Sequence, residues 1–278
     1  MDGILLINKD KGMTSHDVVM QVRRLLNTKK VGHCGTLDPD ATGVLVICIN
    51  KATKAVQFLT SDTKEYICTL SLGKSTDTYD ESGKITEEKE FKGIDHLEEV
   101  IASFIGTQKQ VPPMYSSIKV NGKKLYEYAR NNIEVDVKPR SITIYELEVL
   151  DVCDNEIRLR VSCSKGTYIR SLCHDMARKL GYPGHMKDLI RTRSGCFKIE
   201  DCVTLKNLEE GNYHMISLDD AFNDYDKIIL DDPDIVYHGK KIKSDIDHRV
   251  AVYDTKGHIL AIYDSDGNGY LKSVRGLF

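Results

Sequence analysis

The 278-residue sequence contains no tryptophan, only six prolines and no two cysteines in a C-x-x-C spacing. No apolar run approaches about 18 residues, so we expect no membrane-spanning helix. The lack of C-x-x-C spacing argues against a structural zinc site, and several of the eight cysteines lie in apolar, strand-like runs. We therefore expect reduced, buried thiols, no metal site and a cytoplasmic location.

Positive charge is not in excess either, since 39 Lys and Arg stand against 42 Asp and Glu, a formal net charge of −3. This balance argues against a globally basic nucleic-acid coat, although a local basic face can still bind phosphates. Three clusters along the chain are candidates for such a face: Arg23, Arg24, Lys29 and Lys30; Lys119, Lys123, Lys124 and Arg130; and Lys187, Arg191 and Arg193. Neither a GxGxxG fingerprint nor a Walker loop occurs, so we expect no cofactor.

The hydrophobic pattern predicts an α+β fold with a mixed or antiparallel sheet and flanking helices, because strands and helices do not alternate regularly. The opening MDGILLINKDKG is predicted to be a strand and not a signal peptide, because an acid precedes its short apolar run. The predicted strands are 3–8, 44–49, 65–72, 141–152 and 156–163. The predicted helices are one that Ser15 caps, one over 52–59 and one over 169–180.

Two segments depart from this pattern. Residues 109–135 mix prolines, tyrosines and lysines, and they predict a projecting insertion with an irregular start and a short helix at 124–130. The alternative is an ordinary long loop, although long loops in compact domains are commonly functional. From residue 225 onward, turn signals separate strand candidates at 249–253, 259–263 and 270–274. We therefore predict a catalytic domain over 1–224 and a small β-rich domain over 225–278.

A single acid stands out in the run GHCGTLDPDATGVLVI, which begins at Gly32. Asp38 lies between Leu37 and Pro39 in a glycine-rich loop that leads directly into an apolar strand. A loop anchored to a buried sheet is a common place for a catalytic group. A lone Asp-Pro would by itself indicate only a turn.

This run resembles the catalytic loop of the bacterial TruB family of pseudouridine synthases, whose signature is GH-x-G-T/A-LDP-x-ATG-V/M-L. Further segments of the same family pattern are LGKSTDTYDESG from Leu72, CSKGTYIRSL from Cys163 and LIRTRSG from Leu189. The resemblance covers about residues 1–200. It implies isomerisation of uridine to pseudouridine in the T-loop, at position 55, of tRNA, with base flipping and without a cofactor.

The resemblance also implies roles for individual residues. Asp38 would be the catalytic aspartate, and Arg170 would form an ion pair with it. Tyr66 would stack on the extruded base, and Tyr168 would lie close to that base. The residues implied in substrate binding are His33, Lys54, Leu189, Arg191, Lys119, Lys123, Lys124 and Arg130.

The family pattern further implies partners and accessory parts. The 109–135 insertion would be a thumb that grips the RNA stem-loop, and the C-terminal segment resembles a short PUA-type RNA-binding domain. The expected partner is the tRNA T-arm, with no guide RNA and no membrane, and the expected state is a monomer.

Three other interpretations remain open from the sequence. A guide-RNA-dependent synthase shares the Asp loop but lacks the insertion. An RNA-binding protein that assists tRNA folding needs no catalytic acid, and a single-carboxylate hydrolase needs a second acid or a metal. Whether Asp38 attacks C1′, adds to C6 or removes a ribose proton also stays open.

Overall fold

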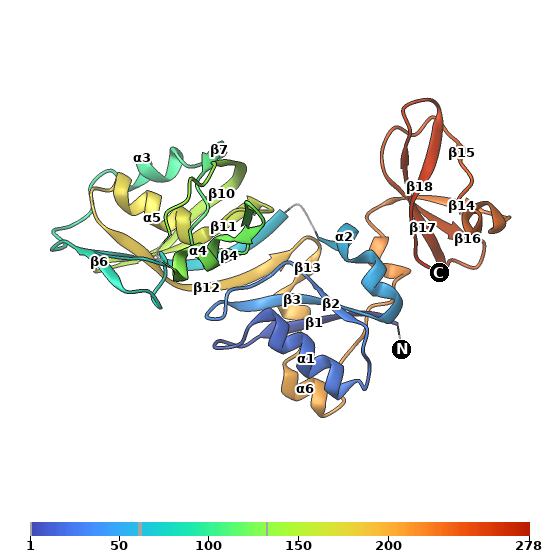
Figure 1. Ribbon diagram of the computed structural model, residues 1–278, viewed down its shortest axis with the longest axis horizontal. Coiled ribbons are helices and arrows are strands. Elements are labelled where there is room, and N and C mark those ends of the chain that lie inside the picture. Colours follow the sequence, from blue (N-terminus) through green and yellow to red (C-terminus); the bar gives the residue numbers. More distant parts are fainter. Residues whose placement is uncertain (1, 61–62, 132) are drawn as a thin grey trace. The chain divides into compact units, whose positions relative to one another are not determined.

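The structure is a computed structural model that describes residues 2–60, 63–131 and 133–278, so residue 132 of the predicted insertion lies outside it. The chain divides into two compact units, whose elements are labelled in Figure 1. Unit 1 comprises Met1–Pro39, Val44–Thr60 and Glu200–Phe278, and unit 2 comprises Asp40–Gly43 and Ser61–Ile199. In the part of the chain that the structure describes, no helix is long and apolar enough to cross a membrane.

In the N-terminal part of unit 1, helix α1 (Ser15–Leu25) packs on strands β1 (Gly3–Lys9), β2 (Val31–Cys34) and β3 (Thr42–Ile49). The further elements here are η1 (Asn50–Ala55), α2 (Val56–Leu59), η2 (Ile199–Asp201), α6 (Leu205–Glu209) and η3 (Asp220–Phe222). β3 pairs with β1 and runs antiparallel to β2. Val18 and Val22 of α1 share one buried core with Leu45 and Ile47 of β3, as their helical spacing predicts.

The N-terminus of α1 differs from the prediction by one residue. Thr14 is the N-cap, and its side chain accepts a hydrogen bond from the Asp17 backbone while Asp17 completes the capping box. The prediction that Ser15 caps this helix is therefore wrong. Ser15 is instead buried, and its hydroxyl bonds to the loop that carries Asp38.

The C-terminal part of unit 1 is a five-stranded sheet in the order β14-β16-β17-β18-β15. Its elements are β14 (Asp226–Leu230), α7 (Asp234–Tyr237), β15 (Ile242–Lys243), β16 (Val250–Asp254), β17 (Ile259–Ser265) and β18 (Tyr270–Gly276). The sheet has its own core, which includes Val236, Val252, Tyr263 and Leu271. The three predicted strands are confirmed as β16, β17 and β18.

Unit 2 is built on five strands, β12, β4, β11, β10 and β7, which lie side by side and antiparallel in this order. Its elements are β4 (Thr63–Leu72), β5 (Lys74–Thr76), β6 (Ile85–Glu88), α3 (Leu97–Ala102), β7 (Gly106–Gln110), β8 (Lys119–Val120), β9 (Lys123–Lys124), α4 (Leu125–Arg130), β10 (Arg140–Cys153), β11 (Glu156–Ser164), α5 (Ile169–Lys179), β12 (Gly184–Ser194) and β13 (Phe197–Lys198). β12 also pairs in parallel with Thr42 and Gly43, the start of β3. α5 packs against β12 and β4, so the predicted mixed α+β architecture is confirmed.

β12 is a central strand that the hydrophobic pattern does not predict. Its sequence places Lys187 next to Asp188, which interrupts the alternation typical of a strand. The pairing with β4 shifts register between Met186 and Asp188, so a local irregularity accommodates these charges.

The predicted insertion begins irregularly over 111–118, as expected, and a hairpin that was not predicted follows. β8 and β9 form a two-residue hairpin around Asn121 and Gly122, which have φ of 51° and 84°. An Asn-Gly pair suits this kind of turn, because both central residues need positive φ. α4 (Leu125–Arg130) then confirms the predicted helix, and Leu125 is fully buried at its start.

Candidate active site

The loop that carries Asp38 is held from the residue before the acid. The Leu37 amide donates to the Ser15 hydroxyl at 2.8 Å, and this hydroxyl donates to the Leu37 carbonyl at 3.1 Å. Ser15 and Leu37 are both buried, so water does not compete for these bonds. The first turn of α1 therefore fixes the main chain directly before Asp38.

The residue after the acid is held by a buried ammonium group. Lys9, at the end of β1, is 0% exposed, and its Nζ donates to the carbonyls of Pro39 at 2.9 Å, Asp10 at 2.9 Å and Met13 at 2.7 Å. The Gly12 amide donates to the same Pro39 carbonyl at 2.9 Å. Asp38 thus lies on a short segment whose two neighbours are both anchored to the beginning of the chain.

Two predicted substrate-binding residues, His33 and Lys54, also belong to unit 1. His33 is a half-buried residue of β2, opposite Ile47 of β3. Lys54, at the end of η1, donates from Nζ to the main-chain oxygen of Phe278 at 2.6 Å and lies 5.6 Å from the centroid of its ring. The ammonium group of Lys54 therefore has a protein acceptor here, and its contact with RNA phosphate stays a prediction.

In unit 2, neighbouring strands bring three of the predicted residues together. Tyr66 of β4 lies directly opposite Arg191 of β12, and Leu189 lies opposite Cys68 two residues further along β4. Tyr66 and Leu189 are largely buried, and Arg191 is 1% exposed. This burial favours a supporting role for Arg191 over a surface contact with RNA.

The main chain at Arg191 passes very close to Gly43. Gly43 has φ of 100°, and a Cβ at this position would lie 2.2 Å from the Arg191 carbonyl oxygen. Only glycine permits both the backbone conformation and this approach. The glycine of the ATG run in the Asp38 signature is thus explained by its close approach to β12.

Arg170, in the first turn of α5, is a buried cation with several acceptors. Its Nη1 donates to an Asp80 carboxylate oxygen and to the Thr78 carbonyl, both at 3.2 Å, and Nη2 donates to the Tyr115 carbonyl at 3.0 Å. The side chains of Arg170 and Asp80 are 6% and 17% exposed. Asp38 belongs to unit 1 and Arg170 to unit 2, so their ion pair stays a prediction.

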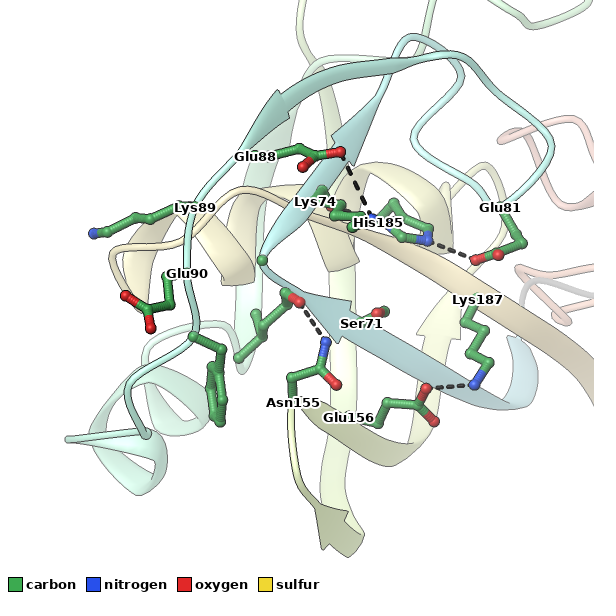
Figure 2. A pocket seen from close by; sticks show the side chains of 13 residues that line it. Ser71, Lys74, Glu81, Glu88, Lys89, Glu90, Asn155, Glu156, His185 and Lys187 are labelled. Atoms are coloured by element: carbon green, nitrogen blue, oxygen red, sulfur yellow. Dashed lines mark hydrogen bonds and ion pairs between the residues drawn. The ribbon is translucent and has the colours of Figure 1, made fainter.

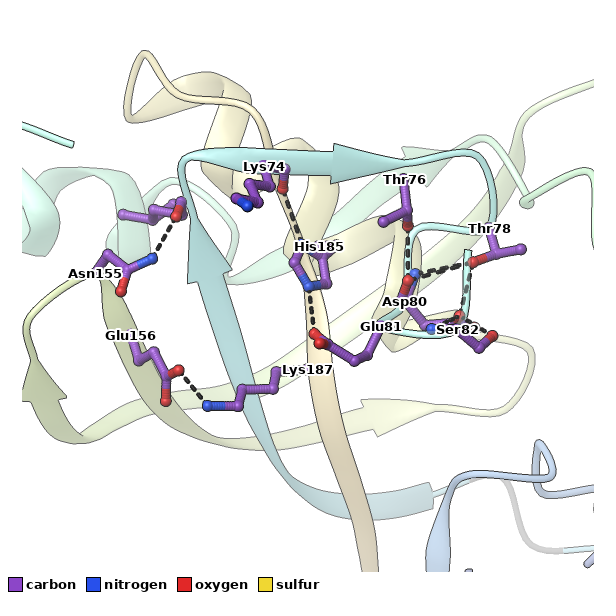
Figure 3. Close-up of polar contacts among 11 residues, drawn as sticks. Lys74, Thr76, Thr78, Asp80, Glu81, Ser82, Asn155, Glu156, His185 and Lys187 are labelled. Atoms are coloured by element: carbon purple, nitrogen blue, oxygen red, sulfur yellow. Dashed lines mark hydrogen bonds and ion pairs between the residues drawn. The ribbon is translucent and has the colours of Figure 1, made fainter. Parts of the chain in front are cut away.

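Asp80 lies in the LGKSTDTYDESG segment of the family pattern, and no role was predicted for it. Its carboxylate also accepts from the Thr78 hydroxyl at 2.7 Å and from the Ser82 hydroxyl at 2.6 Å. Gly83 lets this turn close, because a Cβ there would lie 2.3 Å from the Thr78 hydroxyl. The STDTYDESG segment therefore builds a compact turn (Figure 3), and the Asp80 carboxylate of this turn pairs with Arg170.

Tyr168 is the N-cap residue of α5, and its main chain is held by one side-chain amide. The Gln110 Oε1 accepts from the Tyr168 amide at 2.9 Å, and Gln110 Nε2 donates to the Tyr168 carbonyl at 3.0 Å. The Ser171 hydroxyl donates to the Val111 carbonyl at 3.0 Å. The base of the insertion is thus joined to the start of α5, and the sequence offered no signal for Gln110 because this contact spans 58 residues.

The four cations predicted in the insertion lie close together in the structure. Lys119 of β8 is directly opposite Lys124 of β9, and Lys123 follows the hairpin turn. Lys124 and Arg130 lie 5.4 Å and 5.3 Å from the ring centroid of Tyr126. Like charges directly opposite each other destabilise a hairpin, which makes this arrangement costly in the absence of an anion.

A cavity of about 530 Å³ lies in unit 2 at the far end of β4, and Figure 2 shows its lining. Its charges pair with one another: Lys74 with Glu88 at 3.6 Å, His185 with Glu81 at 2.7 Å, and Lys187 with Glu156. Lys187 is the member of a predicted basic cluster that lines this cavity, and its ammonium group pairs with Glu156. Mutually paired side chains leave little demand for a charged ligand in this cavity.

Comparison with known proteins places these features in a family. The model of the TruB family pseudouridylate synthase N-terminal domain matches residues 23–169, more than half of the chain. The chain belongs to the TruB family. The model of the tRNA pseudouridylate synthase B C-terminal domain matches residues 170–231 of this TruB family member.

Curated relatives and solved structures agree with this assignment. "tRNA pseudouridine synthase B" of Bacillus cytotoxicus is 45% identical over all of this chain and 97% of its own length. The protein of the same name from Geobacillus thermodenitrificans is 53% identical over 75% of this chain and 72% of its own length.

A Cbf5-Nop10-Gar1 complex contains a chain with a TM-score of 0.72 and 28% identity, matched over 95% of this chain and 78% of that one. An H/ACA RNP bound to a substrate RNA contains a chain with a TM-score of 0.73 and 25% identity, over 99% of this chain and 85% of that one. The fold is thus that of the pseudouridine synthases.

Proposed function

We propose that this TruB family member converts uridine to pseudouridine at position 55, in the T-loop of tRNA, without a cofactor. The single observation that carries the proposal is Asp38, an acid in the family signature whose two neighbours are anchored by Ser15 and Lys9. Its curated relatives named tRNA pseudouridine synthase B match the chain over its full length. The reaction breaks the bond between C1′ and N1, turns the uracil and joins C1′ to C5, so it needs no redox partner.

We assign the chemistry to a carboxylate and an aromatic pocket. Asp38 acts as nucleophile or base toward the nucleoside. Tyr66 stacks on the extruded base, Leu189 packs beside it, and Tyr168 lies near the base. Arg170 pairs with Asp38 and favours its ionised form, because a nearby cation stabilises a carboxylate. His33 holds the displaced nucleotide.

We assign RNA binding to the insertion and to the C-terminal segment. The opposed Lys119 and Lys124, with Lys123 and Arg130 nearby, form a cationic surface whose repulsion a phosphate backbone would relieve. Lys54 contacts phosphate once RNA is bound. Residues 225–278 form a small RNA-binding domain beside a catalytic domain over 1–224, in keeping with the separate core of the five-stranded sheet.

A stand-alone enzyme is favoured over a guide-RNA-dependent one. The relatives that match the whole chain at 43–45% identity are named tRNA pseudouridine synthase B. The chain from the H/ACA particle is 25% identical. We further propose that the protein acts as a monomer in the cytoplasm, and that it also assists tRNA folding.

The test uses a T-arm stem-loop that carries tritium at C5 of uridine. Wild-type protein should release tritium, because forming the new bond at C5 displaces that hydrogen. Asp38→Asn should bind the stem-loop with about wild-type affinity and release no tritium. Release by the Asn variant would overturn the assignment of Asp38, and RNA binding without release by the wild type would overturn the enzymatic function.

A further inference from the structure

The turn formed by residues 78–81 determines where Arg170 meets its acceptors. Both contacts of Arg170 Nη1, to the Thr78 carbonyl and to the Asp80 carboxylate, come from this turn at 3.2 Å. Tyr79 and Glu81 flank Asp80 in this turn, and neither takes part in these two bonds. Their own contacts show how the turn is held.

On one side the turn is held by a ring stack. Tyr79 has φ of 62°, a left-handed conformation that is unfavourable for a residue with a large side chain. Its ring stacks on His174 with centroids 4.0 Å apart and an interplanar angle of 17°. Since His174 lies four residues after Arg170 on α5, both side chains project from the same face of the helix. Partial burial lowers the pKa of His174, so the stacked imidazole is neutral at pH 7.

On the other side the turn is held by β12. His185 is 6% exposed, with Nε2 2.7 Å from a Glu81 carboxylate oxygen and Nδ1 2.9 Å from the Lys74 carbonyl, as Figure 3 shows. The Met186 amide donates to the Tyr79 carbonyl at 3.0 Å, and the Glu81 amide donates to the Met186 carbonyl at 3.0 Å. β12 therefore fixes the main chain on both sides of Asp80.

We propose that His174 and His185 are positioning residues that clamp this turn from α5 and from β12, and so set Asp80 against Arg170. The inference rests on the proposed function, in which Arg170 organises the catalytic carboxylate. The clamp explains how a disfavoured backbone conformation at Tyr79 persists beside a functional ion pair.

The test combines local exchange with catalysis. His174→Ala and His185→Ala should each raise the hydrogen-exchange rates of the Glu81 and Met186 amides by about tenfold, the factor expected for losing one stack or ion pair. Each should lower kcat for the T-arm stem-loop by about tenfold and leave KM within about threefold, because the RNA-binding insertion is intact. His174→Phe keeps a flat ring and should restore both the exchange rates and kcat.

The matched control is Tyr182→Ala, which removes an aromatic contact with Phe91 in the same unit but away from the turn. The clamp is overturned if the exchange rates at both amides stay at the wild-type value. Its catalytic part is overturned if the histidine variants lose no more kcat than Tyr182→Ala. A wild-type protein that makes no pseudouridine would overturn the proposed function and with it the catalytic part, whereas the exchange rates test the clamp in either case.

Discussion

Ser15 and Leu37 exchange two hydrogen bonds, one to the Leu37 amide at 2.8 Å and one to its carbonyl at 3.1 Å. The hydroxyl of a single helical residue therefore bonds to both main-chain polar groups of Leu37, the residue that precedes Asp38. Because Asp38 follows Leu37 directly, the position of the proposed catalytic acid depends on this contact.

Ser15→Ala should lower kcat strongly and reduce the free energy of unfolding only moderately. The buried Leu37 amide would lose its acceptor, which costs about 1–3 kcal/mol of stability, and the Asp38 loop would gain freedom. We expect kcat to fall by about tenfold or more, with KM nearly unchanged. Thr14→Ala is the matched control, because it removes the N-cap of the same helix at a cost of about 1 kcal/mol without touching the loop. Equal kcat values for the two variants at a temperature where both are folded would contradict this role of Ser15.

Lys9→Met should be among the most destabilising changes in unit 1. It leaves the carbonyls of Pro39, Asp10 and Met13 without the ammonium donor, at an estimated cost of about 2–4 kcal/mol. Urea unfolding measures the change in free energy of unfolding. The exposed Lys11→Met should stay within about 0.5 kcal/mol of wild type. A Lys9→Met protein as stable and active as Lys11→Met would show that the buried ammonium does not support the loop.

Gln110→Leu should lower kcat, because the main chain of Tyr168 loses its support, without changing RNA affinity. The variant removes both side-chain bonds to the Tyr168 main chain, so the N-terminus of α5 and its neighbour Arg170 lose a support. We expect a fall in kcat of about tenfold. Gln108→Leu, two residues earlier on β7, removes a comparable bond to Phe104 and should leave kcat within about twofold. The two variants are compared by single-turnover kinetics, and equal effects would contradict the prediction.

The cationic hairpin should act through phosphate charge. Lys119→Gln, Lys123→Gln and Lys124→Gln should each weaken binding of the T-arm and reduce the slope of log affinity against log salt by about 1 or less. Lys119→Gln and Lys124→Gln should also raise the stability of the free protein slightly, because each removes the repulsion between these two opposed lysines. The control is Lys206→Gln, which removes an exposed lysine of α6. If a hairpin variant shows the same salt slope as Lys206→Gln, the hairpin does not bind RNA phosphates.

The cysteines should divide sharply in their reactivity toward iodoacetamide. Burial raises the pKa of Cys163 to about 12, and the adjacent Cys34 together with burial raises the pKa of Cys48, so both stay protonated at pH 8. Cys153 and Cys196 are exposed. Mass spectrometry after brief alkylation of the folded protein should find label on the exposed pair and none on the buried thiols, with activity retained. Early labelling of Cys163 would mean that unit 2 opens more readily than its packing indicates.

Much of the fold was predictable because many elements carry a local pattern. The helical spacing of Val18 and Val22 and the apolar run of β3 produced elements where they were expected. β12 was missed because its adjacent charges and register shift obscure the strand pattern. The β8–β9 hairpin was missed although Asn121-Gly122 is a strong local signal for it.

The family motifs could be recognised in the sequence, whereas the contacts that support these segments could not be predicted from it. The motifs around Asp38 and Arg170 could be identified from the sequence, and so could the segment that contains Asp80. The contacts of Lys9 with Pro39 and of Gln110 with Tyr168 join segments 30 and 58 residues apart. Such contacts depend on how the strands pair, which no local pattern encodes.

The proposed function is tested most directly by mapping pseudouridine at single-nucleotide resolution in a full-length unmodified tRNA after incubation with the wild type or with Asp38→Asn. We expect one pseudouridine, at position 55 in the T-loop, with the wild type and none with the variant, although both bind the tRNA. Pseudouridine at position 55 made by Asp38→Asn, or a wild-type product confined to other positions, would contradict the proposed function.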